Sequence, residues 1–147
     1  MYKHRLPLEL FVGVMLLLVL APALSAQTEA DLQQKFGPPE RSGYYLVRKG
    51  VRLKVSTEKE KVREMLIEPV DVNSPVSAGS FIPAPTVNEI IAELAPVSLR
   101  GKHVRSIVFT SGPSSLAAEE YEQVVISTVS TGRGGTSGIT SAGIRWK

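Results

Sequence analysis

Residues 43–68, GYYLVRKGVRLKVSTEKEKVREMLIE, carry the clearest structural pattern in the sequence. Val51, Leu53 and Val55 alternate with polar residues, which is the period of a β-strand with one buried and one wet face. Gly50 separates this alternation from the apolar run before it, and glycine favours a tight turn because it accepts a positive φ. The stretch therefore predicts three antiparallel strands, at residues 44–48, 51–56 and 62–68.

The third of these strands has no unique buried face in the sequence. Met65 and Ile67 share one face of a regular strand, whereas Val62 and Leu66 share the other. Both pairs are apolar, so the pattern alone leaves open which face meets the core.

Two short helices are predicted outside this region. The segment Thr28–Phe36 begins with an approximate capping box, in which Asp31 follows Thr28 by three residues, and it ends at Gly37. The segment Thr86–Leu94 begins with a second capping box completed by Glu89. Its apolar residues recur at helical spacing, which predicts one buried face: Val87, Ile90, Ile91 and Leu94.

The last third of the chain is less regular. Residues 106–110 suit either a strand or a buried helical turn, and residues 116–120 suit one helical turn. Residues 121–130 and 139–146 are rich enough in β-branched and aromatic residues to predict a closing hairpin.

Together these elements predict an α+β fold. We expect an antiparallel sheet of about five strands with two short helices on one face, which is a two-layer sandwich. Residues 27–147 form a single domain in this scheme, with halves at 27–69 and 86–147 joined by a proline-rich linker at 70–85.

The start of the chain has the three parts of a secretory signal peptide. A basic segment at Met1–Leu6 precedes the apolar run Leu10–Leu20, and small residues follow at Ala21–Ala26. We predict cleavage after Ala26, with Ser25 as the alternative site, and a periplasmic or extracellular protein. The other interpretation is that the apolar segment is retained as a membrane anchor, which would be the protein's membrane contact.

Composition excludes several classes of function. The chain has no cysteine, which excludes thiol chemistry, cysteine-ligated metals and lipid attachment at a cysteine. Its formal charge of +3 falls by one unit when residues 1–26 are removed, so charge gives no case for nucleic-acid binding.

Arg100, Lys102, His103 and Arg105 form a basic cluster after the second predicted helix. Such a group can bind a phosphate or the carboxylates of a partner, and it is also the ordinary composition of a solvated loop. These four residues are the binding site that the sequence suggests.

Catalytic chemistry has little support in the sequence. His103 is the only histidine after residue 26, and although Ser106 is close to it, no nucleophile elbow surrounds that serine. One histidine without cysteines does not make a zinc site. We therefore predict no catalytic residue, no metal and no cofactor. Glu120 and Glu122 support the alternative, a carboxylate-dependent hydrolase of unknown substrate, if they share a cleft with the basic cluster.

Tyr44, Tyr45 and Trp146 are the large aromatic residues expected near a surface. They would mark a protein-binding patch if they were exposed together, and they would be core residues otherwise.

The order of Asp31-Leu32, then Phe36-Gly37-Pro38-Pro39, then a meander resembles small envelope proteins built from a helix and a hairpin. The outer-membrane-assembly small lipoproteins and the β-lactamase-inhibitor-like proteins are families of this type, and the resemblance covers residues 28–69. This chain lacks the lipid-attachment cysteine of those families, so a lipid-anchored role does not carry over. The resemblance implies a protein-binding role in the envelope rather than an enzyme. We therefore expect a non-enzymatic binding or accessory protein with another envelope protein as partner, and the small net charge of the chain predicts no nucleic acid.

Overall fold

The computed structural model describes residues 27–70, 81–133 and 136–147. The predicted signal peptide and the greater part of the predicted linker, residues 71–80, lie outside the described residues.

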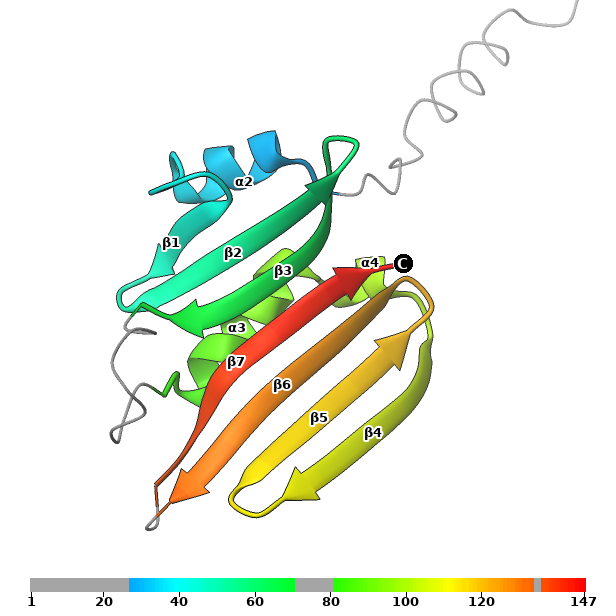
Figure 1. Cartoon of the computed structure of the whole chain (residues 1–147). Coiled ribbons are helices and arrows are strands. Elements are labelled where there is room, and N and C mark those ends of the chain that lie inside the picture. The colour runs from blue at the N-terminus through cyan, green and yellow to red at the C-terminus, as the bar shows by residue number, and fades with distance from the viewer. Residues whose placement is uncertain (1–26, 71–80, 134–135) are drawn as a thin grey trace, which may run out of the picture.

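Seven antiparallel strands form one sheet in the order β1-β2-β3-β7-β6-β5-β4 (Figure 1). The first three strands form one meander, the last four form another, and pairing between β3 and β7 joins them. The strands are β1 Tyr44–Arg48, β2 Val51–Glu58, β3 Lys61–Pro69, β4 His103–Ser111, β5 Ser114–Tyr121, β6 Val124–Arg133 and β7 Thr136–Trp146.

This architecture corrects the predicted fold class. The prediction of about five strands and two helices was wrong, because the described residues contain seven strands and three short helices. The predicted helical turn at residues 116–120 lies inside β5. Alanine and glutamate favour a helix there, but pairing with β4 on one side and β6 on the other outweighs that local preference.

The helices are α2 Glu29–Phe36, α3 Ala84–Leu94 and α4 Val97–Arg100. The capping box of α2 is confirmed: Asp31 N donates to Thr28 Oγ1 and Thr28 N donates to Asp31 Oδ2. The capping box predicted for α3 was wrong, because α3 begins at Ala84 without a side-chain cap. Pro85 falls in its first turn, where a missing N–H leaves no hydrogen bond unmade.

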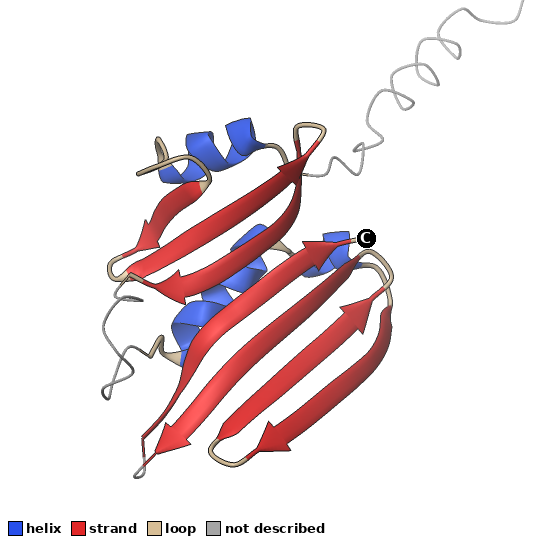
Figure 2. Ribbon diagram, in the orientation of Figure 1, coloured by secondary structure: helices blue, strands red, loops and turns tan. Residues whose placement is uncertain are grey.

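The core lies between the helices and one face of the sheet (Figure 2). Val87, Ile90, Ile91 and Leu94 of α3 are buried there, which confirms the predicted apolar face of that helix. A register shift between β2 and β3 resolves the ambiguous strand: Ser56 pairs with Glu64 and Thr57 with Val62, so β3 carries one extra residue there. The shift turns Val62 to the same face as Met65 and Ile67, and all three are fully buried.

Candidate functional site

The two faces of the sheet differ in what covers them. We call the face that packs against α2 and α3 the helix face, and the opposite one the open face. Glu119 of β5 pairs with the core residue Ile126, so Glu119 belongs to the helix face. Its neighbours Ala118 and Glu120 therefore belong to the open face, because side chains alternate along a strand.

Strand β4 is exposed along its whole length, on both faces. It lies at one border of the sheet, away from the helices that cover the first meander and β7 (Figure 1). Val108, which lies on its helix face, is 68% exposed. An apolar strand without cover on either side is unusual in a soluble domain.

The open face carries an apolar patch at β4 and β5. We define the β4 patch as Ile107, Phe109 and Leu116, whose exposed fractions are 48%, 63% and 41%. Phe109 pairs with Leu116, and Leu116 pairs in turn with Val129 of β6, so the patch continues as a row across three strands. Contiguous exposed apolar side chains of this kind mark contact surfaces for other molecules.

The outer edge of β4 has no strand beside it within the described residues. Native proteins guard such edges with charged side chains, proline or a covering segment. Residues 106–112 contain neither a charged residue nor proline. The backbone groups of this stretch that point away from β5 are therefore free to pair with another chain.

The opposite edge of the sheet is short and partly covered. β1 is five residues long, and the segment before it turns back to pair with its first residue, Tyr44. Glu40 N donates to Tyr44 O, and Tyr44 N donates to Arg41 O, each at 2.8 Å. The two edges thus differ, and only β4 offers a long, unguarded one among the described strands.

The predicted basic cluster does not form one site. Arg100 Nε donates to Ala95 O at 2.6 Å, and the Arg100 guanidinium lies 5.5 Å from the centre of the Tyr121 ring. His103 packs edge-on against the same ring, with centroids 5.3 Å apart. Arg100 and His103 therefore come together at Tyr121, whereas Lys102 is exposed in the turn before β4.

A bulge at Val104 separates His103 from Arg105. His103 pairs with Tyr121 and Arg105 pairs with Glu120, which are adjacent on β5 and point to opposite faces. His103 and Arg105 are two positions apart, so regular alternation would place them on the same face of the sheet. Because of the bulge, they lie on opposite faces. Nothing in the sequence around Val104 signals this register shift.

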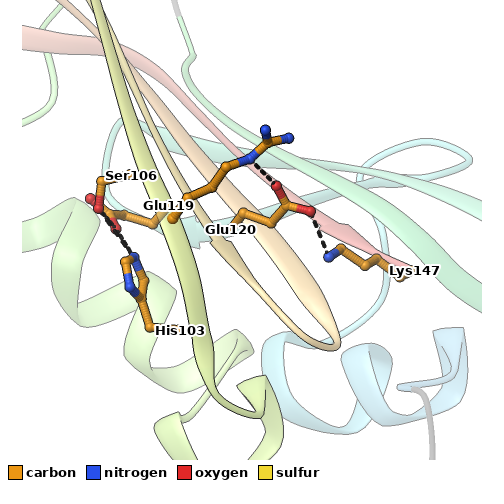
Figure 3. A network of polar contacts seen from close by, with 6 residues as sticks. His103, Ser106, Glu119, Glu120 and Lys147 are labelled. Atoms are coloured by element: carbon orange, nitrogen blue, oxygen red, sulfur yellow. Dashed lines mark hydrogen bonds and ion pairs between the residues drawn. The ribbon is translucent and has the colours of Figure 1, made fainter.

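On the helix face, His103, Ser106 and Glu119 form a hydrogen-bonded cluster (Figure 3). Ser106 Oγ donates to Glu119 Oε2 at 2.6 Å, and His103 Nε2 lies 2.7 Å from the same oxygen and 3.1 Å from Ser106 Oγ. The hydrogen bonds from Ser106 and then His103 lower the pKa of Glu119.

This cluster does not have the order of a catalytic triad. A triad places histidine between the two other groups, with the nucleophile on one ring nitrogen and the carboxylate on the other. Here both Ser106 and Glu119 contact the same nitrogen, Nε2 of His103. The side chains of His103 and Glu119 are also 47% and 44% exposed, so water competes for each contact.

On the open face, Glu120 is held by two cations (Figure 3). Arg105 Nε donates to Glu120 Oε2 at 2.6 Å, and Lys147 Nζ donates to Glu120 Oε1 at 2.8 Å. Lys147 and then Arg105 lower the pKa of Glu120, which keeps it ionised. Its charge is thus compensated at the border of the β4 patch.

Glu122 is placed apart from Glu120. It lies in the turn after β5, where its Oε2 accepts a hydrogen bond from Lys102 N at 2.9 Å. The described residues contain no group of three or more histidine, aspartate or glutamate side chains able to hold a metal, and none of their helices is long and apolar enough to span a membrane.

The three aromatic residues do not form one exposed patch. Tyr45 is fully buried, and its hydroxyl donates to Glu29 Oε1 at 3.1 Å. Trp146 is partly buried against the core. Tyr44 lies apart from them on the open face, with the Arg41 guanidinium 3.9 Å from the centre of its ring.

Sequence reasoning missed the β4 patch. Residues 106–110 are apolar enough to predict a core element, and no feature of that run indicates that both its faces are exposed.

No family model and no curated protein matches this chain. Among solved structures, it has a likeness to an extracellular protein containing a SCP domain from Bacillus anthracis, with a TM-score of 0.32 and 14% identity. The match covers 85% of this chain and 45% of that one, so this chain spans less than half the length of that protein. A likeness this distant assigns neither a family nor an activity.

Proposed function

We propose that this chain is an exported, non-enzymatic binding domain that pairs with an extended segment of a partner protein along the outer edge of β4. The observation that carries the proposal is the complete exposure of β4, an apolar border strand without guarding charges between Ser106 and Gly112. An added strand would satisfy the free backbone groups of this edge.

Side chains on both faces support binding as well. Strand addition gains affinity from main-chain hydrogen bonds and specificity from alternate side chains. A partner strand beside β4 would contact Ile107 and Phe109 on the open face and Val108 on the helix face. We therefore expect its own side chains at this place to be apolar on both faces.

The enzyme alternative finds no support in the contacts of the polar groups. The negative charge of Glu120 is compensated by Arg105 and Lys147, and Glu122 accepts a hydrogen bond from the backbone of a turn. The chemistry of a hydrolase needs two carboxylates or a nucleophile and a base that converge on one substrate position.

The export part of the proposal rests on the signal-peptide pattern of residues 1–26. The resemblance of residues 28–69 to small envelope proteins with a helix and a hairpin supports the same compartment and a protein as partner. Strand pairing suits an exported chain without cysteine, because it needs neither a disulfide nor a cofactor.

The proposal is tested by selecting displayed peptides on the purified exported protein and measuring amide hydrogen exchange with the strongest peptide. We expect slower exchange at the amides of β4, because an added strand protects its outer backbone groups. Val108→Lys should lower the affinity for the peptide by more than tenfold, because lysine on an edge strand discourages pairing with another strand.

Val104→Lys is the matched control, because Val104 is also an exposed valine of β4 but lies in the bulge, where regular pairing is interrupted. We expect nearly unchanged binding in this variant. Protection confined to other elements, or equal binding by Val108→Lys and the unmodified protein, would contradict the proposal.

A further inference from the structure

We infer that the partner at the β4 edge is a second copy of this chain, paired antiparallel about a two-fold axis at Val108. This inference rests on the proposed function, because it uses the same edge, and it identifies the segment that occupies it. The two sheets would join through β4 of each copy into one continuous sheet.

The sequence of β4 is symmetric in chemical class about Val108. Residues 106–110 read hydroxyl, apolar, apolar, apolar, hydroxyl, as Ser-Ile-Val-Phe-Thr. With the axis at Val108, Ile107 of each copy lies opposite Phe109 of the other, and Val108 lies opposite its own counterpart. Ser106 lies opposite Thr110, so apolar side chains meet apolar ones and hydroxyls meet hydroxyls.

A neighbouring register is less favourable. An axis at Ile107 would place Arg105 opposite Phe109 and Ser106 opposite Val108 of the other copy. In that arrangement Ile107 with its own counterpart is the single apolar pair within residues 105–109, whereas the axis at Val108 gives three apolar pairs. The axis at Val108 instead places Arg105 opposite Ser111.

The charges of β4 do not oppose this pairing. With the axis at Val108, the two copies of Arg105 lie about 20 Å apart along the strands, at roughly 3.3 Å per residue. This exceeds the distance of about 8 Å over which exposed charges interact at physiological ionic strength. Glu120 of the same copy also compensates each Arg105.

The edge at β1 is shorter than that at β4 and partly occupied, which favours an assembly of two copies. A sheet with two open edges would add further copies and grow into a filament. In the pair both β4 edges are occupied, whereas β1 is only five residues long and its first residue, Tyr44, already pairs with Glu40 and Arg41. The geometry therefore predicts a closed dimer.

Cysteine crosslinking tests the inference directly, because the chain has no cysteine of its own. Residues directly opposite in an antiparallel pair have Cα atoms roughly 4.5–5.5 Å apart, which lies within the range of about 4.4–6.8 Å that a disulfide spans. Val108→Cys should therefore form a disulfide dimer rapidly under mild oxidation.

Val104→Cys is the matched control. It is exposed on the same strand, but in the proposed register its two copies are about 26 Å apart, at roughly 3.3 Å per residue. We expect little crosslinking of this variant. In sedimentation equilibrium, the unmodified protein should move from monomer toward dimer with rising concentration, and Val108→Lys should remain monomeric with an unchanged circular dichroism spectrum.

Four results would overturn the inference. Equal crosslinking at positions 104 and 108 would indicate random collision or parallel pairing, and stronger crosslinking of Ile107→Cys would reject the axis at Val108. A mass that stays monomeric at every concentration, or that grows beyond two copies, would reject the closed dimer. If the protein stays monomeric while a selected peptide still protects β4, the inference fails and the proposed function stands.

Discussion

Ile144 of β7 lies directly opposite Met65 of β3, and both side chains are fully buried. Ile144 also pairs with Ile126 of β6 on its other side. This row crosses the junction of the two meanders and belongs to the same buried cluster as the apolar residues of α3. The core is therefore continuous from the first half of the chain to the second.

Shortening Ile144 tests the importance of this junction. We expect Ile144→Ala to lower the free energy of unfolding by about 2–5 kcal/mol, because it leaves a cavity in a closed core. Ile144→Val should cost only about 1 kcal/mol. Urea denaturation gives both values, with Ile107→Ala as the control, since Ile107 is 48% exposed and should contribute far less. Equal losses at positions 107 and 144 would show that this row is not central to stability.

The continuous core also predicts that the halves do not fold separately. A fragment of residues 27–69 would expose Met65 and Ile67, which in the whole chain are buried and lie opposite residues of β7. We expect this fragment and the fragment 86–147 to be unfolded by circular dichroism. The complete protein should unfold in a single calorimetric transition whose calorimetric and van't Hoff enthalpies agree. A dispersed NMR spectrum from either fragment would contradict this expectation.

The sequence predicts the first meander well because its strands meet water on one side. Val51 and Leu53 alternate with Arg52 and Lys54, and such alternation identifies both the strand and its buried face. β4 has no such contrast, because its apolar residues are exposed on both faces. A run such as Ile107–Phe109 predicts burial, and whether a described helix covers it is a tertiary property that periodicity does not encode.

The candidate site was harder to predict than the fold. Proximity in the sequence drew attention to Ser106 beside His103, and the two side chains contact each other. It grouped Arg100 and Arg105 together, although the bulge at Val104 places His103 and Arg105 on opposite faces. A bulge depends on the register of the partner strand, so residues on β4 alone give no sign of it.

Gly43 and Gly50 allow the cost of a steric contact to be measured. Both have positive φ, 73° and 75° respectively. A Cβ at Gly43 would lie 2.9 Å from Val55 O, whereas a Cβ at Gly50 would meet nothing within 4 Å. We expect Gly50→Ala to destabilise by about 1 kcal/mol through its backbone conformation alone.

Gly43→Ala should lower the free energy of unfolding by roughly a further 1–3 kcal/mol, because the contact with Val55 O would force the local backbone to move. The carbonyl of Gly43 also accepts a hydrogen bond from Val55 N at 2.7 Å, so that movement would lengthen a contact that anchors β2. Thermal and urea unfolding of the two variants give the difference. Similar losses for both would mean that the contact with Val55 relaxes without cost.

The pKa of Glu119 reports whether the cluster on β4 and β5 is formed in solution. Its pKa lies below the ordinary value of 4.5, chiefly because Ser106 donates a hydrogen bond to the carboxylate and secondly because His103 does. A lowered pKa of Glu119 stabilises the fold at pH values above the pKa of this group in the unfolded chain. This contribution is lost as the pH falls through the pKa of the folded state.

Because the hydrogen bond from Ser106 is the main cause, Ser106→Ala should raise the pKa of Glu119 toward 4.5 in a carboxyl-carbon NMR titration. Thr110→Ala removes another hydroxyl from β4, one whose partner is Ser115, and should leave that pKa unchanged. The same pKa in Ser106→Ala as in the unmodified protein would show that the hydrogen bond to Glu119 does not persist in water.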